Sequence, residues 1–549
     1  MVVRAVVANS IAVRAIKPQR VRSPEETAGL NLIRACRTSP DLLTRETPEK
    51  VMIPSRLWSD LHFRGNPRLR FVSLLFLLAV VSCCVICSGV KPAPPPVTQG
   101  PVVQPVLTTG DQTMLLRAQP TVSFVSGGGS GPLVITADES VTYQQMDGVG
   151  ASLTDSSAWL LWNKLDASQQ TTLMQSLFSP SAGIGISFLR QPMGASDFSA
   201  GGNYSYDDVP SGQTDPSLLS FSISHDTVYI IPLVKQALTI NPALKVVTLP
   251  WSPPAWMKTS GTMNGGSMNT SYFPSLAQYF VKFLQAYQQQ GIPIYAISAQ
   301  NEPLYTTPAY PSESLPASDE SDFLANHLGP ALTSAGLGSV KVFGYEHNWD
   351  NPAYPESVLG SAASGYVSGT SFHCYAGDVS AQSQVQAAYP AKDIWFTECT
   401  GTVGSNFAGD LAWNAEHLLI GATRNWARSV SLWNIALDQN SGPKNGGCSN
   451  CRGVVTINDG ATPPTITYNV EYYVLGHLGK FVVPGALRIA SNTFGPGSIE
   501  DVAFKNPDGS KVLLVLNGSS ASSSFAVNWK GESFNYTLPA GALATFTWK

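Results

Sequence analysis

From about residue 146 onward, short apolar runs alternate with longer segments in which apolar residues recur three and four positions apart. Eight of the runs are predicted to be strands: Met146–Val149, Ile184–Leu189, Val246–Leu249, Ile294–Ala299, Val340–Phe343, Ser371–Cys374, Ile394–Thr397 and Val430–Trp433. Helices are predicted between them, for example at Thr227–Leu238, Ser275–Gln290 and Glu320–Ala335, and Tyr468–Phe481 can supply the eighth.

Strands that alternate with helices of this length pair in parallel through right-handed crossovers. Eight such units over residues 146–485 predict an α/β fold, a (β/α)8 TIM barrel. A doubly wound open sheet is the alternative, but no glycine-rich phosphate loop follows any of the predicted strands.

Both flanks of the barrel return to the two-residue period of strands. Residues 106–145 contain short strands broken by the GGGSG segment at 127–131, and residues 486–549 alternate again, with a turn at Pro507-Asp-Gly between two apolar runs. We expect the two segments to form one β-sandwich attached to the barrel.

The N-terminal part of the chain differs in composition. Residues 1–70 are basic, with 13 Lys/Arg and 6 Asp/Glu, and are expected to be disordered or cytosolic. Residues 71–90 form an uncharged apolar run preceded by Arg64, Arg68 and Arg70, and the Pro-rich residues 91–105 follow as a predicted linker. The run is either a type II signal anchor or, if translation starts at Met52, the core of a cleaved signal peptide.

Both alternatives direct the rest of the chain into the secretory pathway, as a single-pass membrane protein or a secreted, lysosomal or extracellular one. Four glycosylation sequons agree with export, and all lie after the apolar run: Asn203, Asn269, Asn517 and Asn535. Cys448 and Cys451 predict a local disulfide in a glycine-rich loop, because no second cysteine pair suggests a metal site.

The charge balance narrows the class of ligand. The whole chain carries a net charge of −4, and with +7 on residues 1–70 the remainder carries −11. Binding of nucleic acid by this remainder is therefore not expected. With 12 Trp, 19 Tyr and 22 Phe and few charges, the protein suits flat, uncharged ligands such as sugars.

Chemistry is expected where barrel strands end, because their C-terminal ends converge on one rim. Two glutamates occupy such positions, Glu302 after the fourth strand and Glu398 at the end of the seventh. The other candidates are Arg190, Asp197, Trp251, Asn301, His373, Tyr375 and Trp433. A pair of carboxylates with aromatic and amide groups predicts a retaining glycosidase, with Glu302 as acid/base and Glu398 as nucleophile.

Their environments are expected to separate the two roles. We expect Arg190 to keep Glu398 charged, and the charge of Glu398 to raise the pKa of Glu302. His373 is expected to support the site through hydrogen bonds, and Cys399 to be a packed thiol. The seven histidines show no metal-ligand spacing, so neither a metal ion nor a cofactor is predicted.

These motifs resemble glycoside hydrolase family 30, the glucosylceramidase family, from about residue 140 to the C-terminus. The resemblance is carried by MDGVGASLTDSSAWLL, FLRQPMGASDFS, LPWSPPAWMKTSGTMNGG, AISAQNEP, SFHCYAGD, WFTECTG, LWNIALDQNSGP and VAFKNPDGSKVLLVLNGSS. It implies the barrel, the sandwich and the roles of Glu302 and Glu398. It also implies that Asp197, Trp251, Asn301 and Trp433 hold the glucosyl ring, with Tyr375 and Arg190 around the nucleophile.

The resemblance implies a β-glucoside substrate, most simply glucosylceramide hydrolysed to glucose and ceramide. The loop after the eighth strand, from Gly442 to Gly453, is more similar to microbial and fungal members, some of which cleave β-1,6-glucan. An endo-β-1,6-glucanase is therefore the alternative, and an inactive carbohydrate-binding protein a distant one. A membrane would be a partner through residues 71–90 if they are not cleaved, and the sequence carries no signal for or against an activator protein.

Overall fold

The computed structural model describes residues 99–127 and 129–549. The predicted cytosolic region, the apolar run at residues 71–90 and most of the predicted linker lie outside these residues. Within the described part of the chain, no helix has the length and apolar character needed to span a membrane.

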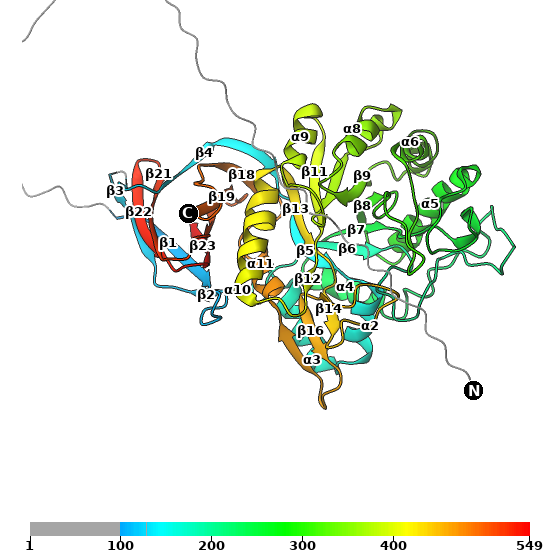
Figure 1. Ribbon diagram of the computed structural model, residues 1–549, viewed down its shortest axis with the longest axis horizontal. Helices are drawn as coiled ribbons and strands as arrows, with labels where there is room; N and C mark the ends of the chain where they lie inside the picture. Colours follow the sequence, from blue (N-terminus) through cyan, green and yellow to red (C-terminus); the bar gives the residue numbers. More distant parts are fainter. Residues whose placement is uncertain (1–98, 128) are drawn as a thin grey trace, which may run out of the picture. The chain divides into compact units, whose positions relative to one another are not determined.

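Eight parallel strands close into a barrel (Figure 1), so the predicted TIM barrel is confirmed. The strands are β5 (Gly148–Ser152), β6 (Phe188–Pro192), β7 (Lys245–Leu249), β8 (Ile294–Ser298), β9 (Lys341–Asn348), β10 (Gly369–His373), β11 (Asp393–Glu398) and β13 (Ala427–Leu432). Each overlaps or directly follows one of the apolar runs. The pairing of β13 with β5, in which Ser429 lies opposite Gly148, closes the ring.

A buried apolar cluster fills the barrel, and its five members come from five different strands: Phe188, Val247, Ala296, Phe343 and Trp395. The rings of Phe343 and Trp395 stack with centroids 3.8 Å apart. Below this cluster, Asp147 accepts a hydrogen bond from the Trp395 indole and pairs with Arg428. This end of the barrel is therefore closed, which leaves the C-terminal strand ends for a site.

Helices follow the strands where the sequence predicts them. The α-helices are α2 (Asp155–Asn163), α3 (Ala167–Phe178), α4 (Ile230–Ile240), α5 (Phe273–Gln289), α6 (Ala317–Asp322), α7 (Gly329–Ser334), α8 (Ala353–Leu359), α9 (Ala381–Ala388), α10 (Phe407–Trp413) and α11 (Val470–Gly479). The helix predicted at Glu320–Ala335 is continuous but changes type, because a π-helical stretch, η3 (Phe323–Leu328), lies between α6 and α7. A second π-helical stretch, η5 (Asn414–Ala422), continues α10. Short 3-10 turns are η1 (Ala255–Met257), η2 (Thr270–Tyr272) and η4 (Ala362–Gly365).

Both flanks of the barrel form one ten-stranded sheet, in the order β2-β1-β23-β20-β19-β18-β4-β21-β22-β3, with β1 also paired to β3. The strands before the barrel are β1 (Gln99–Thr108), β2 (Arg117–Ala118), β3 (Val122–Ser126) and β4 (Val134–Gln145). Those after it are β18 (Leu487–Ser491), β19 (Ile499–Lys505), β20 (Lys511–Asn517), β21 (Ser523–Trp529), β22 (Glu532–Leu538) and β23 (Leu543–Trp548). Figure 1 shows the early strands in blue beside the late strands in red. The predicted sandwich built from both ends is confirmed, including the β19–β20 hairpin around Pro507.

One boundary prediction is wrong. The linker predicted for residues 91–105 is contradicted from Gln99 onward, where β1 begins. Pro101 and Pro105 belong to the proline-rich stretch whose composition suggested a linker. Within β1, however, the pairing changes from β3, up to Val103, to β23, from Gln104 onward. A strand that changes partners tolerates proline near the change.

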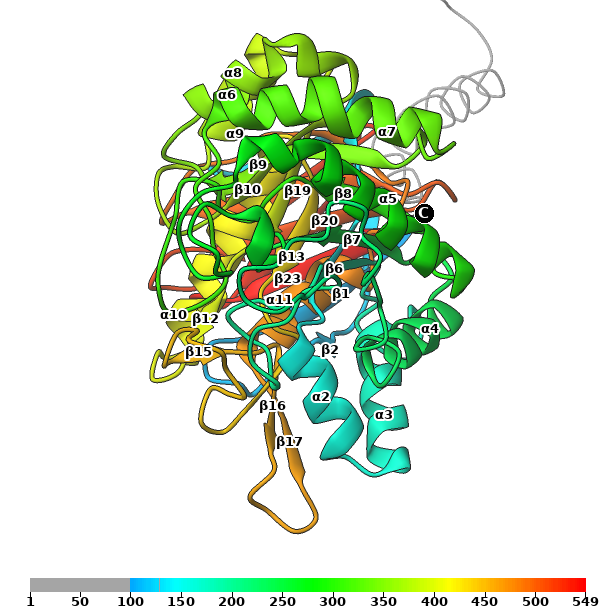
Figure 2. The same cartoon turned by 90° about the vertical axis from the view of Figure 1, so that its right-hand side faces the viewer.

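Smaller strands extend the loops at the C-terminal end of the barrel. β12 (Gly401–Thr402) pairs with β15 (Cys451–Arg452), and β14 (Ala436–Asp438), β16 (Val455–Asn458) and β17 (Thr465–Tyr468) form a three-stranded sheet. Figure 2 shows the β16–β17 hairpin beside α2 and α3. The barrel meets the sandwich through α11, where the buried His477 hydrogen bonds to Thr108 of β1 and Thr545 of β23.

Candidate active site

A cleft of about 940 Å3 opens at the C-terminal ends of the barrel strands. Seven of the predicted site residues line it: Asp197, Trp251, Asn301, Glu302, Tyr375, Glu398 and Trp433. Arg190 and His373 are fully buried and contact the two glutamates from below. The structure therefore brings all nine predicted residues together.

Glu398 ends β11 and is 5% exposed. Its Oε2 accepts a hydrogen bond of 2.5 Å from Nη1 of Arg190, and its Oε1 accepts one of 2.8 Å from the hydroxyl of Tyr375. Both oxygens thus face donors, which is the arrangement of an ionised carboxylate. The expected contact with Arg190 is present.

Glu302 follows β8 in a strained backbone. Its φ is +47°, in the left-handed region, and its N–H donates to the carbonyl of Glu346 at 3.0 Å. A non-glycine residue keeps this conformation only where its surroundings impose it, as they do at functional sites. The side chain is 17% exposed, and its Oε1 lies 3.2 Å from Nδ1 of His373.

Oxygen atoms of the two carboxylates lie close together. An oxygen of Glu302, a nitrogen of His373 and an oxygen of Glu398 all lie within 4.8 Å of one another. This is near the separation of roughly 5–5.5 Å between carboxyl groups of retaining glycosidases, and well below the roughly 6.5–9.5 Å of inverting ones. Inverting enzymes need the wider separation to hold a water molecule between one carboxylate and the sugar.

The raised pKa expected for Glu302 is not found. Burial acts to raise it, but the hydrogen bond and charge of His373 outweigh burial and hold the Glu302 pKa below its ordinary value, with help from His347 and Arg190. The expectation counted only the negative charge of Glu398. It left out the histidines, which the fold brings beside Glu302 from β9 and β10.

His373 carries the proton of this pair. Burial lowers the pKa of His373, but the charge of Glu398 and the hydrogen bonds to Glu302 and Glu346 raise it to about 9. One ring nitrogen lies 3.2 Å from Glu302 and the other 3.2 Å from Glu346. The imidazolium of His373 thus lies between the carboxylate of Glu302, in the cleft, and a second carboxylate beneath the cleft.

That carboxylate, Glu346 on β9, is a residue that sequence reasoning missed. It is fully buried and accepts hydrogen bonds of 2.8 Å from Ser298 and from Thr397. Burial opposes its charge, but Arg190 and His373 hold its pKa at about 2. Glu346 lies three residues after Phe343, the last residue of the fifth predicted strand. Had that strand been extended by three residues, Glu346 would have stood at its C-terminal end, where candidate site residues are expected.

Two tryptophans form one wall of the cleft. Trp251 and Trp433 stack with centroids 4.9 Å apart, and the guanidinium of Arg190 lies 4.9 Å from the first ring and 5.4 Å from the second. Asn301 accepts a hydrogen bond of 2.6 Å from Arg190. Arg190 therefore contacts the Glu398 carboxylate, the Asn301 amide and the aromatic wall at once.

Asp197 presents an acceptor that no described residue satisfies. Its Oδ1 is buried and has no hydrogen-bond partner among the described residues. Burial and the charges of Glu398 and Glu302 raise its pKa well above the ordinary value. Unpaired buried oxygens are costly, so a sugar hydroxyl entering the cleft would gain a hydrogen bond here. The backbone carbonyl of Asp197 accepts from Asn445 and Gly447, in the loop before Cys448.

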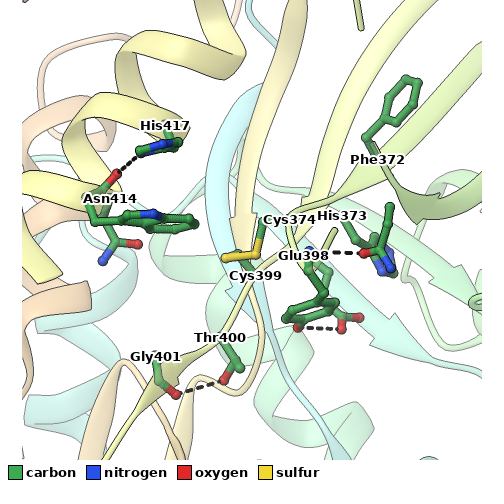
Figure 3. The surroundings of a disulfide bond; sticks show 12 residues. Phe372, His373, Cys374, Glu398, Cys399, Thr400, Gly401, Asn414 and His417 are labelled. Carbon is green, nitrogen blue, oxygen red and sulfur yellow. Dashed lines mark hydrogen bonds between the residues drawn. A yellow bond between two sulfur atoms is a disulfide. The ribbon is translucent and has the colours of Figure 1, made fainter. Parts of the chain in front are cut away.

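Two disulfides border the cleft. Cys448 and Cys451 are bonded, as the sequence predicts. Cys374 and Cys399 are also bonded, with Cα atoms 5.4 Å apart, so the expectation of a packed thiol at Cys399 is wrong (Figure 3). The two residues are 25 positions apart in sequence, and only the parallel pairing of β10 with β11 makes them neighbours.

The predicted sequons differ in accessibility. Asn203 and Asn535 are exposed and Asn269 is partly exposed. Asn517 is fully buried, and its amide donates to the carbonyls of Ala521, Leu538 and Pro539. The structure contradicts a glycan at Asn517, because the amide nitrogen is used inside the sandwich.

The grouping of Glu302, His373 and Glu398 also has the spacing of metal ligands. The donor set does not suit a cation, however. Both nitrogens of His373 already face carboxylates, and the guanidinium of Arg190 places a fixed positive charge against Glu398. The arrangement is that of a charge network rather than a metal centre.

Two models of one protein family match this chain, and they divide it into the barrel and the β-sandwich. The family model for the glycosyl hydrolase family 30 TIM-barrel domain matches residues 146–482, and that for the family's β-sandwich domain matches residues 485–546. An endo-1,6-β-D-glucanase of Aspergillus fumigatus is 32% identical over 80% of this chain and 92% of its own. One from Neurospora crassa is 37% identical over 68% and 79%.

The chain is also similar to a relative named for a different substrate and to a solved endo-β1,6-glucanase structure. The lysosomal acid glucosylceramidase of Mus musculus is 30% identical over 76% of this chain and 84% of its own. Among solved structures, an endo-β1,6-glucanase superposes with a TM-score of 0.75 at 32% identity, covering 81% of this chain and 99% of that one.

Proposed function

The chain belongs to glycosyl hydrolase family 30, and from that premise we propose that it is a retaining endo-β-1,6-glucanase. In this proposal Glu398 is the nucleophile and Glu302 the acid/base. The observation that carries the chemistry is the pair of carboxylates within 4.8 Å in one cleft. An inactive carbohydrate-binding protein would have no use for this pair.

The geometry supports a double displacement. Glu398, held by Arg190 and Tyr375, attacks the anomeric carbon while Glu302 gives a proton to the leaving oxygen. Water then attacks the glycosyl–enzyme ester, and Glu302 takes the proton of that water. Because the resting proton lies on His373, we propose that it passes across the 3.2 Å contact to Glu302 when the leaving oxygen arrives.

A group of polar side chains in the cleft supports a glucan over a glycolipid. Beyond the glutamates, its lining includes Asn348, Thr400, Thr402 and Asn450, whose amides and hydroxyls suit the hydroxyls of further sugar units. A ceramide needs an apolar surface in that place. Two relatives named as endo-1,6-β-D-glucanases support the same substrate. The alignment covers 92% of the Aspergillus fumigatus protein and 79% of the Neurospora crassa protein.

Glucosylceramide is the second candidate, and the observation that favours it is local. Leu304 and Tyr305, which directly follow Glu302-Pro303 in the chain, are each 46% exposed. Tyr305 lines the cleft, so this short apolar surface lies where a leaving group departs. The lysosomal acid glucosylceramidase relative supports the same candidate.

Purified full-length protein incubated separately with β-1,6-glucan, β-1,3-glucan and detergent-dispersed glucosylceramide tests the proposal. We expect a rapid fall in viscosity and short oligosaccharides from β-1,6-glucan alone. Glucose released from glucosylceramide with the glucans left intact would instead establish the second candidate. No turnover of any β-glucoside would leave the binding protein.

The roles of the two glutamates make a separate prediction. Glu398→Gly is expected to abolish turnover of an aryl β-glucoside, and azide should restore part of it, because the small anion fits the vacated space and attacks from the same side. The product should be an α-glucosyl azide. The matched variant Glu302→Gly should give the β-glucosyl azide, since azide then attacks the glycosyl–enzyme. The opposite pairing of products would reverse the assignment.

Export from the cytosol is part of the same proposal. Two disulfides within the described residues are expected of a protein that folds in an oxidising compartment. Sequencing the N-terminus of the native protein distinguishes a retained signal anchor, with residues 71–90 present, from a cleaved signal peptide.

A further inference from the structure

A covalent bond joins the two strand ends that carry the predicted nucleophile and its hydrogen-bond donor. We propose that the Cys374–Cys399 disulfide is a positioning element of the active site, which holds the Tyr375 hydroxyl against the carboxylate of Glu398. The inference rests on the proposed role of Glu398 as nucleophile.

The chain order around the disulfide places it between functional groups. Cys374 stands between His373 and Tyr375, and Cys399 directly follows Glu398. Figure 3 shows the bond lying beside Glu398, with His373 on the same strand end as Cys374. The bonded cysteines are thus adjacent in sequence to His373, Tyr375 and Glu398, three residues of the charge network.

Backbone pairing between β10 and β11 cannot hold the Tyr375 hydroxyl against Glu398, because the ladder between these strands becomes irregular where it ends. Phe372 lies opposite Phe396, but the next pair is His373 with Glu398, so Thr397 has no opposite residue. A bulge of this kind ends regular pairing and re-aims side chains. Beyond His373 and Glu398 the register contains no further pair.

Packing holds Tyr375 only partly. The residue is 43% exposed, and its backbone N–H donates to the Oδ1 of Asn348 at 3.0 Å. No regular element contains it, since β10 ends at His373 and α9 begins at Ala381. By contrast, Cys399 is 2% exposed and its carbonyl accepts from the N–H of Trp433 at 2.7 Å. The disulfide therefore ties a loosely held tyrosine to a rigid position.

The tied hydroxyl has a defined task. Burial of the hydroxyl and the negative charge of Glu398 raise the pKa of Tyr375 well above its ordinary value, so the group stays protonated and donates. With Arg190 on the other oxygen, this hydrogen bond fixes the rotation of the carboxylate toward the anomeric carbon. A nucleophile held in its attacking orientation gains rate through a smaller loss of entropy.

The test compares wild type, Cys374→Ala/Cys399→Ala, Tyr375→Phe and the combined variant on an aryl β-glucoside. We expect the cysteine variant to lower kcat about tenfold with KM changed less than about twofold. Tyr375→Phe should lower kcat about tenfold in the wild type but less than about threefold without the disulfide, because the hydroxyl is already displaced. Equal factors for Tyr375→Phe in both backgrounds would overturn the inference, as would an unchanged kcat in the cysteine variant.

Cys448→Ala/Cys451→Ala is the matched control, since it removes a disulfide that borders the same cleft without joining β10 to β11. Its effect on kcat should multiply with that of Tyr375→Phe. Cys374→Ala/Cys399→Val, which refills the volume of the sulfurs, and thermal unfolding check the fold. If neither cysteine variant folds, the bond serves the fold as a whole and the inference fails. A wild type inactive on all β-glucosides would refute the proposed function instead.

Discussion

The two glutamates of the cleft, Glu302 and Glu398, have different surroundings. Glu398 faces a guanidinium and a phenol, whereas Glu302 faces the imidazolium of His373. Both are glutamates at strand ends, and their surroundings alone separate them. Tyr305, three residues after Glu302, also lines the cleft.

Tyr305→Ala should weaken binding of β-1,6-gluco-oligosaccharides, raising KM about fivefold with little change for an aryl β-glucoside. Its ring is 46% exposed in the cleft, near-parallel to Tyr310 at 6.3 Å, and offers a stacking face worth about 1 kcal/mol. Steady-state kinetics on both substrates measure this. Tyr366→Ala, at 40% exposure beside Gly329, is the matched control. An equal rise in KM for both substrates would argue against a leaving-group site.

Among the described elements, β9 has an unusual backbone near its C-terminal end. Tyr345 and Glu346 have φ values of +77° and +53°, which place two consecutive non-glycine residues in the left-handed region. The conformation directs the Glu346 carboxylate to Arg190 and His373 beneath the cleft. Backbone strain at a strand end is here connected with the charge network.

Glu346→Gln keeps the shape of the side chain but removes its charge. We expect the free energy of unfolding at pH 7 to fall by about 3 kcal/mol, because Arg190 and His373 lose a buried counter-charge, and kcat to fall at least about tenfold. Urea unfolding and kinetics measure the two effects. In the control Glu320→Gln, burial already raises the pKa of the glutamate to about 7, so the amide should change stability much less. Equal losses in both variants would show that the network adds nothing specific.

At the scale of the whole molecule, a buried histidine lies where the barrel meets the sandwich. His477 of α11 contacts strands from both chain ends, and burial lowers its pKa from 6.5 to about 3. The unfolded chain takes up a proton below pH 6.5 that the folded protein cannot accept until about pH 3. Stability should therefore fall as the pH decreases through this range.

His477→Gln keeps hydrogen-bonding capacity without titrating. The loss of unfolding free energy between pH 7 and pH 4.5 should be smaller in this variant than in the wild type by about 2–3 kcal/mol. Urea unfolding at the two pH values measures the difference. Thr108→Val removes one partner but leaves the imidazole, so it should keep the wild-type dependence on pH. An unchanged dependence in His477→Gln would exclude this histidine as the cause.

Periodicity in the chain was enough to predict the eight strands, the principal helices and the sandwich made from both flanks. It also identified Glu302 and Glu398, because parallel strands in a barrel end on one rim and a residue's place at a strand end is a local property. The disulfide between Cys448 and Cys451 was predictable from the sequence for the same reason, because the two cysteines are only three positions apart in one loop.

Other features arise only when separate strands meet. The bond between Cys374 and Cys399, the position of Glu346 under Arg190, and the lowered pKa of Glu302 each depend on neighbours from other strands. The burial of Asn517 likewise follows from sandwich packing, which a sequon does not encode. The sequence by itself determined which groups reach the rim, through periods of two and 3.6 residues. Tertiary structure alone decided their charges and partners, because electrostatic interaction and burial depend on distance in space rather than along the chain.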